Sequence, residues 1–147
     1  PKEGYITIEG NGHIRDKIHH MILSAEFRIY FSASGAFLEV CKDEIGVLVQ
    51  QGKKVVLISE DGRIPFAEEQ EMLEGIQLYL VPEGLYESGE EDRSAQIRLI
   101  IDSEYVLTGE TGGKAQDACL YSAQKNFVRV FKDAMRNEIE LIRLREI

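Results

Sequence analysis

The chain has 147 residues, of which 17 are basic and 26 acidic, giving a formal net charge of −9. This length favours one domain that buries its own core without disulfides or structural metals, so we expect residues 1–147 to form a single domain. Hydrophobic residues make up 44% and charged residues 29% of the chain. That balance excludes disordered, collagen-like and coiled-coil chains.

The acidic excess lies in one segment of the sequence. Residues 60–93 contain eleven acidic residues and two arginines, and the rest of the chain is balanced. Without an imposed basic face, we expect this chain to bind no nucleic acid by itself. No apolar run approaches the ~20 residues of a membrane span. The cysteines Cys41 and Cys119 lack CxxC spacing, which suits free thiols in the cytoplasm.

The hydrophobic pattern alternates between strand-like and helix-like segments. Continuous or alternating apolar runs predict strands, and a 3.6-residue period predicts helices. The predicted strands are residues 5–8, 27–31, 55–58, 76–81, 97–101, 105–107 and 118–121, and the predicted helices are residues 14–25, 37–49, 65–73 and 123–145. Residues 83–95 carry five acids and predict an exposed loop. This order predicts an α/β fold: a mixed, mostly parallel sheet flanked by helices, with a long C-terminal helix.

Two glycine-rich segments raise the possibility of nucleotide binding. Gly10 and Gly12 lie between a predicted strand and a helix, but Arg15 occupies the third glycine position of the dinucleotide fingerprint. In a later loop, P-loop spacing places Thr108 at the first glycine and Ala115 at the Ser/Thr position. We favour ordinary turns over a nucleotide site, and expect no cofactor.

The three histidines lie on one predicted helix. His13 and His20 share a face but stand about two turns, ~10 Å, apart, which is too far for one metal ion. Neither has a cysteine or carboxylate at metal-finger spacing. Cys41 lies on an apolar helix face and fits a core residue better than a nucleophile. We therefore expect surface histidines, no metal site and no catalytic residues.

Small polar residues follow the predicted interior strands at their carboxyl ends. They are Ser32, Ser34, Ser59 and Asp61. Ligands of open α/β sheets bind at this edge, and hydroxyls beside a carboxylate suit sugars, polyols or other neutral polar metabolites. Ordinary turns also favour serine and aspartate, so a ligand site and a plain set of turns both stay open.

Several hydrophobic and turn motifs occur in a particular order along nearly the whole chain. They are Ile6-Thr7-Ile8-x-Gly10, the helical pattern of residues 14–25, and residues 28–33, 51–58, 100–109 and 121–131. This order resembles the effector domain of TrmB-type, sugar-specific transcriptional regulators. That effector domain is similar to one phospholipase D repeat, so the resemblance implies a phospholipase D-like sandwich.

Active members of the phospholipase D class carry His-x-Lys-x4-Asp followed by Gly-Ser-x-Asn. A register on Asp102 places Ala95 at the histidine and Ile97 at the lysine. Glu110 and Gly112 replace the serine and asparagine, and no histidine in the chain has a lysine two residues later. Covalent phosphodiester chemistry then lacks its nucleophile and the cation that holds the phosphate. The resemblance therefore implies a sensing domain that is not an enzyme.

The resemblance also implies partners. A winged-helix domain would precede Pro1 and make the DNA contacts, while this chain would bind a small effector and form a homodimer. Sugar-binding members have an additional C-terminal β domain that does not follow here before Ile147, so a sugar is one candidate among polar metabolites. The expected ligand residues are Ser32, Ser34, Ser59, Asp61, Asp102, Thr108 and Glu110, and the expected dimer residues are Phe127, Phe131 and Met135.

Two other functions stay open. A divergent phosphodiesterase or nuclease would use Asp102, Glu110 and a histidine supplied from elsewhere. A pure assembly module would dimerise through the long C-terminal helix and bind no ligand. Against that second alternative, the apolar residues of an amphipathic helix are more often plain core.

Overall fold

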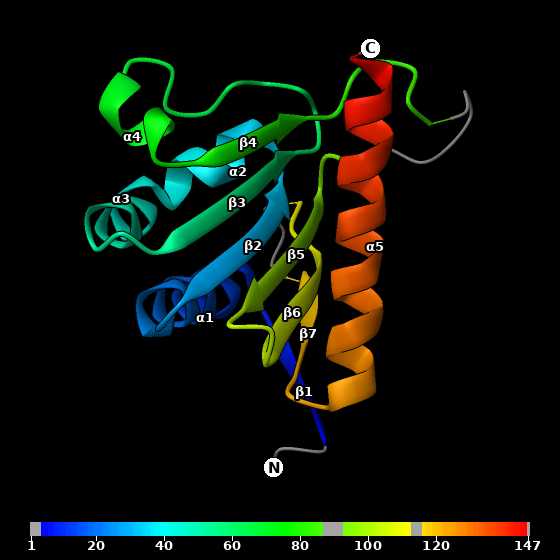
Figure 1. Ribbon diagram of the computed structural model, residues 1–147. Helices are drawn as coiled ribbons and strands as arrows, with labels where there is room; N and C mark the ends of the chain where they lie inside the picture. The colour runs from blue at the N-terminus through cyan, green and yellow to red at the C-terminus, as the bar shows by residue number, and fades with distance from the viewer. Residues whose placement is uncertain (1–3, 87–92, 113–115, 147) are drawn as a thin grey trace.

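A computed structural model describes residues 4–86, 93–112 and 116–146. Its framework is one seven-stranded sheet with helices on both faces (Figure 1). The strands are β1 (Tyr5–Glu9), β2 (Arg28–Ala33), β3 (Lys54–Ser59), β4 (Gln77–Leu80), β5 (Gln96–Ile101), β6 (Tyr105–Glu110) and β7 (Ala118–Ser122). The helices are α1 (Asn11–Ser24), α2 (Gly35–Val40), α3 (Lys42–Gln50), α4 (Gln70–Glu74) and α5 (Lys125–Arg145). The α/β prediction and the long C-terminal helix are thus confirmed.

The sheet has the strand order β1-β7-β6-β5-β2-β3-β4. Only β2–β3 and β3–β4 are parallel among the described strands, while the other four neighbouring pairs are antiparallel. The prediction of a mostly parallel sheet is therefore wrong. The reason is connectivity: helices connect β2 to β3 and β3 to β4, whereas β5, β6 and β7 follow one another through connections too short for a parallel crossover.

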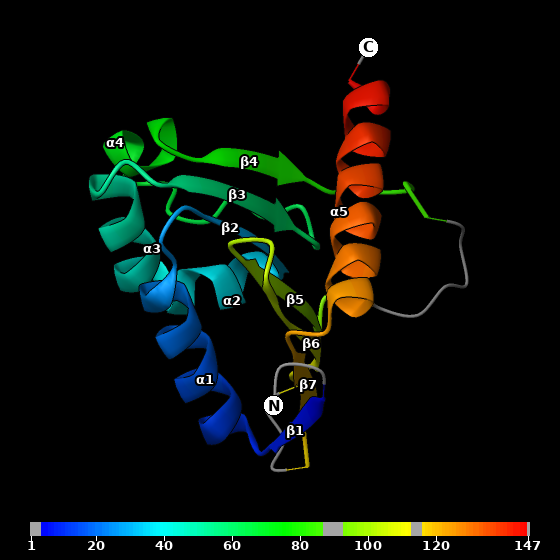
Figure 2. The same cartoon turned by 60° about the horizontal axis from the view of Figure 1, so that its bottom comes forward.

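The two faces of the sheet carry separate hydrophobic clusters. Helices α1 to α4 lie on one face and α5 on the other (Figure 2). Because successive strand residues point to opposite faces, Val55 and Leu57 pack toward α1 and α3, whereas Val56 and Ile58 pack toward α5. The continuous apolar run of β3 is therefore explained by burial on both faces.

Helix α5 is amphipathic. Its buried face includes Val128, Met135 and Ile142, which pack on the sheet. The helix begins after Gln124, whose side-chain Oε1 accepts a hydrogen bond from the backbone N–H of Phe127 at 2.7 Å. Among the described residues, no helix is both long enough and apolar enough to cross a membrane.

Two predicted helices differ in the structure. The helix predicted over residues 37–49 is broken at Cys41, whose backbone (φ −98°, ψ 13°) ends α2 and begins α3. The helix predicted from Pro65 starts only at Gln70, because Phe66 has a left-handed backbone (φ 56°) and buries its ring in the core. Parts of two predicted loops, residues 87–92 and 113–115, lie outside the described residues.

Candidate functional site

Asp102 lies in the turn between β5 and β6, at the amino end of β2. Asp102 and Ser103 both have positive φ, 53° and 58°, and the Glu104 N–H donates to the Ile101 carbonyl at 2.9 Å, so the two residues are the centre of a type I′ turn. The carboxylate accepts hydrogen bonds from the backbone N–H groups of Glu26, Phe27 and Arg28 at 2.8–2.9 Å. Burial alone would raise the pKa of Asp102, but these N–H groups outweigh it and hold the pKa below its ordinary value. Asp102 thus ties the hairpin to the α1–β2 connection.

Three of the predicted ligand residues meet at the opposite end of the parallel strands, as the sequence indicated. The Ser34 hydroxyl caps α2 by accepting from the backbone N–H of Phe37 at 3.1 Å. Asp61 accepts from the backbone N–H of Gly35 at 3.0 Å and from the Ser59 hydroxyl at 3.2 Å. Ser59 is fully buried. These bonds use the polar atoms to hold turns, which favours the structural interpretation of this group.

Ser32 lies on the other face of the sheet, beneath α5. It belongs to a buried ionic cluster, which we define as Ser32, Glu60, Arg98 and Glu138. The Arg98 Nη2 donates to the Ser32 Oγ at 2.9 Å, to a Glu60 oxygen at 2.9 Å and to a Glu138 oxygen at 2.6 Å. The Ser32 hydroxyl also donates to Glu60 at 2.6 Å. The cluster joins β2, β5 and the end of β3 to α5.

Arg93 and Tyr86 cover this cluster. The Arg93 guanidinium lies 3.6 Å from Glu60 and 3.7 Å from Glu138, and its Cζ lies 4.0 Å from the centroid of the Tyr86 ring. The Tyr86 hydroxyl donates to Glu138. Two arginines therefore face two carboxylates, which compensates the charge inside the protein.

The two carboxylates of the cluster are not equivalent. Burial raises the pKa of Glu60, and the adjacent Glu138 raises it further. Burial also opposes ionisation of Glu138, but the charge of Arg98 and the hydrogen bonds with Glu60, Tyr86 and Arg98 together outweigh it and lower the pKa of Glu138. Glu138 is thus the better ionised partner of Arg98.

The sequence interpretation missed the charged members of this cluster. A signal existed at both ends of the Arg98–Glu138 contact. Arg98 interrupts the apolar run of β5, and Glu138 lies on the apolar face of α5, beside Ile139. Each of these charged residues occupies a position where the hydrophobic period predicts an apolar residue. Two such residues of opposite charge indicate a buried ion pair.

Thr108 and Glu110 lie on β6, on the face that α5 covers. Thr108 is opposite Arg98, and Arg98 is opposite Ser32 on the next strand. Glu110 is opposite Gln96 near the end of the sheet and is exposed. The structure therefore places Thr108 beside the ionic cluster. Glu110 lies at the end of β6 that is remote from the turn containing Asp102.

The positions of the degenerate catalytic motif lie in different environments. Ala95 is in the turn before β5, and Ile97 is 1% exposed in the core on the face of the sheet that α1 to α4 cover. Gly109 is required by packing, because a Cβ there would lie 2.5 Å from the Ala118 carbonyl oxygen. The lysine position of the motif is thus part of the hydrophobic core.

The predicted dimer residues of α5 are engaged inside the chain. Met135 is fully buried, so the prediction that it forms a dimer interface is corrected: it packs on the sheet. Phe127 and Phe131 are half-buried, and their rings pack edge to face with centroids 4.9 Å apart. The Phe127 ring also packs edge to face on the Tyr5 ring, with centroids 5.1 Å apart. The exposed apolar residues of α5 lie elsewhere on the helix.

A cavity of about 410 Å³ opens between α1 and the β5–β6 hairpin, and we name it the α1 cavity. The rings of Tyr105 and Tyr121 stack there at 6.2 Å, and Lys17 Nζ lies 4.0 Å from the Tyr121 centroid. Its lining consists of Lys17, His20, Met21, Ser24, Glu26, Ile101, Asp102, Glu104, Tyr105 and Tyr121. Of the predicted ligand residues, Asp102 reaches this cavity.

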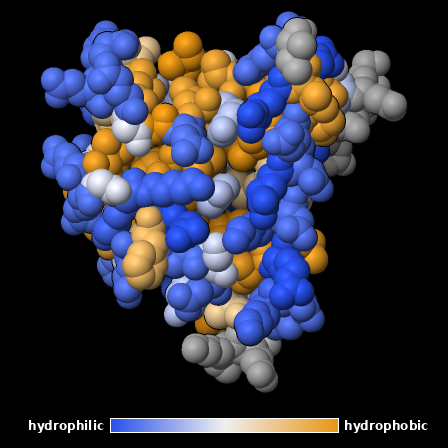
Figure 3. Space-filling view, viewed as in Figure 1, coloured by the Kyte–Doolittle hydropathy of each residue, from blue (hydrophilic) through white to orange (hydrophobic). Residues whose placement is uncertain are grey.

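A larger groove, about 690 Å³, lies between α5 and strands β2 to β4. Its lining includes Tyr30, Tyr79 and Arg136, and none of the predicted ligand residues is among the described residues that line it. Figure 3 shows this side of the molecule, where apolar surface near β3 and β4 meets the polar surface of α5.

Cys41 is a core residue, as predicted, with 1% exposure. Burial raises the pKa of its thiol to about 12; Glu44 adds to the rise, and Arg15 acts against it. At neutral pH a thiol with this pKa is protonated and does not act as a nucleophile.

No protein-family model matches the chain, and no curated protein matches it in sequence. Solved structures do resemble it. TrmBL2, described as an archaeal chromatin protein with a novel mode of DNA binding, superposes with a TM-score of 0.69 at 18% identity over 94% of this chain. This chain spans 53% of the TrmBL2 chain.

Two further solved structures are also similar. NucT from Helicobacter pylori superposes with a TM-score of 0.66 at 14% identity, covering 93% of this chain and 96% of NucT. Nuc from Salmonella typhimurium, a phospholipase D family member, has a TM-score of 0.58 at 15% identity, covering 92% of this chain and 93% of Nuc. The described chain therefore has a phospholipase D-like fold.

Proposed function

We propose that this chain is a non-catalytic effector domain of a TrmB-type transcriptional regulator, which binds a small polar metabolite and forms homodimers. The observation that supports a non-catalytic domain is the burial of Ile97. It fills the motif's lysine position with 1% exposure inside the core. A cation that holds phosphate oxygens would have no route to substrate from that position.

The α1 cavity is the ligand site that we propose. Stacked tyrosine rings give an apolar wall, while Lys17, His20 and Glu26 supply polar groups around it. This combination suits a small polar molecule with an apolar face, such as a sugar. Asp102 supports the cavity by holding the hairpin turn, because its carboxylate oxygens already accept three backbone hydrogen bonds.

Helix α5 offers the homodimer surface. Val130, Leu141 and Leu144 are 63%, 48% and 63% exposed. Together with the exposed Ala134 and Asn137 they recur at spacings of four and three residues, which is the seam of a two-helix coiled coil. A second copy of α5 is the occupant that this repeat fits. DNA would be contacted by a separate domain, consistent with the net charge of −9.

The experiment is a thermal-unfolding screen against sugars, sugar phosphates, nucleotides and common metabolites. A ligand at about a hundred times its Kd adds ~2.7 kcal/mol and raises the midpoint by several degrees. We expect the shift to vanish in Lys17→Ala and to persist in Lys125→Ala, a matched lysine on α5. Equal shifts in both variants would contradict the α1 cavity as the site.

A pure assembly module is the second candidate, and the exposed seam of α5 favours it. A dimer that responds to no compound in the screen would support it over the effector domain. The enzymatic alternative has its own assay with bis(p-nitrophenyl) phosphate. Turnover above background that Asp102→Asn abolishes would overturn the non-catalytic proposal.

A further inference from the structure

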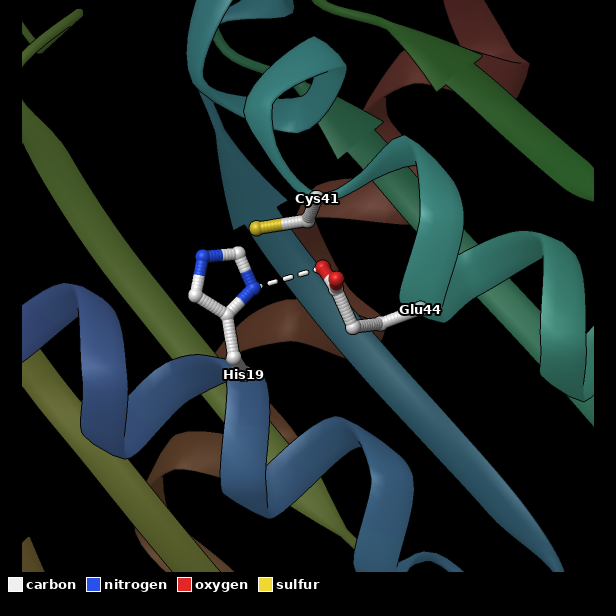
Figure 4. A group of neighbouring side chains, drawn as sticks. All are labelled: His19, Cys41 and Glu44. Carbon is white, nitrogen blue, oxygen red and sulfur yellow. Dashed lines mark hydrogen bonds and ion pairs between the residues drawn. The ribbon is translucent and has the colours of Figure 1, made fainter.

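Three side chains with metal-binding atoms converge between α1 and α3. His19 Nδ1 lies 2.5 Å from a Glu44 carboxylate oxygen, and the Cys41 sulfur lies beside them (Figure 4). One ligand atom from each residue lies within 4.8 Å of the other two. The three residues take no part in the proposed effector site, because His20, not His19, lines the α1 cavity.

Secondary structure fixes the position of each of these side chains. His19 is in the middle of α1, Cys41 is the junction of α2 and α3, and Glu44 follows in the first turn of α3. Cys41 and Glu44 are three residues apart, the spacing that brings neighbouring side chains together along a helical turn. Buried Ile18 and Ile45 belong to the core between the helices. Such a supported backbone holds ligands in place better than a loop does.

We infer that His19, Cys41 and Glu44 form a binding site for a divalent zinc ion. Imidazole nitrogen, thiolate sulfur and carboxylate oxygen are the ligands that zinc takes in proteins. One thiolate and one carboxylate balance the two positive charges of the ion. With bonds of about 2.0–2.3 Å, tetrahedral ligand atoms stand about 3–4 Å apart. Ion binding therefore requires the 2.5 Å contact of His19 with Glu44 to open and the longer separations, up to 4.8 Å, to close.

The site has three protein ligands and therefore leaves one tetrahedral position for water or a small exogenous ligand. It is reachable from solvent, since the side chains of His19 and Glu44 are 30% and 18% exposed. The buried Cys41 lies at the inner side of the group. Loading requires zinc to displace the thiol proton, so zinc binding releases a proton.

The experiment is a zinc titration of chelator-stripped protein against a chromophoric competitor. We expect one zinc per chain with a Kd on the order of 1 μM or tighter. Cys41→Ser, His19→Gln and Glu44→Gln are each expected to weaken binding by about tenfold or more. Matched controls are Cys119→Ser, a buried cysteine on β7, and His13→Gln, an exposed histidine on α1; both are expected to bind as the unchanged chain does.

Cobalt(II) gives a second readout that reports ligand identity. A thiolate-to-cobalt charge-transfer band is expected in the unchanged chain and in Cys119→Ser, and its loss in Cys41→Ser identifies the sulfur. If Cys41→Ser fails to fold, the partly exposed His19→Gln and Glu44→Gln variants carry the test. Absence of stoichiometric zinc binding by the unchanged chain, or equal weakening in the two control variants, would overturn the site.

Discussion

The Arg98 guanidinium lies 2.6 Å from the carboxylate of Glu138, and this contact fastens α5 to the middle of the sheet. Both residues are buried, at 8% and 4% exposure. Taking two charges out of water costs free energy that their attraction offsets only when both are present. The pair therefore favours this position of α5, because a displaced helix would separate Glu138 from Arg98 and leave Glu60 as the nearby carboxylate of Arg98.

The first prediction concerns the removal of one member of this pair. Arg98→Met is expected to lower the free energy of unfolding by about 3–5 kcal/mol, because Glu60 and Glu138 remain buried after losing their nearer cation, and Arg93 lies 3.6 and 3.7 Å from them. Adding Glu138→Leu to this variant is expected to recover part of the loss. Urea unfolding monitored by circular dichroism measures both changes.

The matched control for that prediction is the exposed pair of Arg143 and Glu140, at 3.5 Å. Arg143→Met is expected to change stability by about 0–1 kcal/mol, as exposed pairs do. A loss in Arg98→Met no larger than in Arg143→Met would show that the cluster contributes nothing to the position of α5.

The second prediction concerns Asp102 and pH. Its pKa is lowered in the folded state, so its contribution to stability is present above the ordinary value of 3.8 and is lost as pH falls through the folded-state pKa. Asp102→Asn is expected to cost about 1–2 kcal/mol at neutral pH, because an amide cannot accept all three backbone hydrogen bonds. Below the folded-state pKa the two proteins are expected to converge in stability.

Unfolding midpoints between pH 2 and pH 7, in steps of about one unit, test both statements. A constant gap between Asp102→Asn and the unchanged chain over this pH range would contradict the linkage.

Local pattern was enough to predict most elements of this fold. A short continuous apolar run fits a strand buried on both faces, as in β3, and apolar residues at helical spacing, such as Ile14, Ile18 and Met21, fit a helix with one buried face. Both patterns can be recognised from residues that are close together in the sequence. The break at Cys41 escaped prediction because the 3.6-residue period continues across it. Phe66 was missed for another reason: its left-handed backbone is held by core packing and by the Glu39 carboxylate, which accepts from its N–H.

The candidate sites were less predictable than the elements. Ser34, Ser59 and Asp61 were correctly placed at one edge of the sheet, since strand ends can be located in sequence. The Arg98–Glu138 contact depends on residues far apart in the chain, and only the packing of α5 on β5 brings them together. The same holds for His19 and Glu44, which meet because α1 packs against α3. Residue spacing in the sequence could exclude a metal site built from neighbouring residues. It could not exclude a metal site whose ligands come together only when the chain folds.

The third prediction separates exposed from buried residues of α5. Leu141→Lys is expected to convert a dimer to a monomer that keeps its fold, because Leu141 is 48% exposed. Its unfolding midpoint is expected to lose the dependence on protein concentration that a dimer shows. Met135→Ala is expected to lose about 2–5 kcal/mol of stability through the cavity that it leaves in the core. Sedimentation equilibrium gives the association state, and thermal unfolding gives the stability. Arg129→Lys, also on α5, is the control that keeps the dimer. A monomeric unchanged chain, or a Leu141→Lys variant that stays dimeric, would remove the helix seam as an interface.

The last prediction asks whether the phospholipase D motif can be rebuilt on this chain. Combining Ala95→His with Ile97→Lys restores the motif in sequence, but Ile97 lies in the core with 1% exposure. A lysine there must bury its ammonium group without a carboxylate partner, which costs several kcal/mol. We therefore expect the double variant to unfold at much lower urea concentration and to show no phosphodiester turnover. Ile97→Met, which conserves volume, is expected to cost less than about 1.5 kcal/mol. If the double variant folded normally and hydrolysed bis(p-nitrophenyl) phosphate, the lysine position would be accessible, and the loss of catalysis would rest on two side chains instead of on the burial of Ile97 in the core.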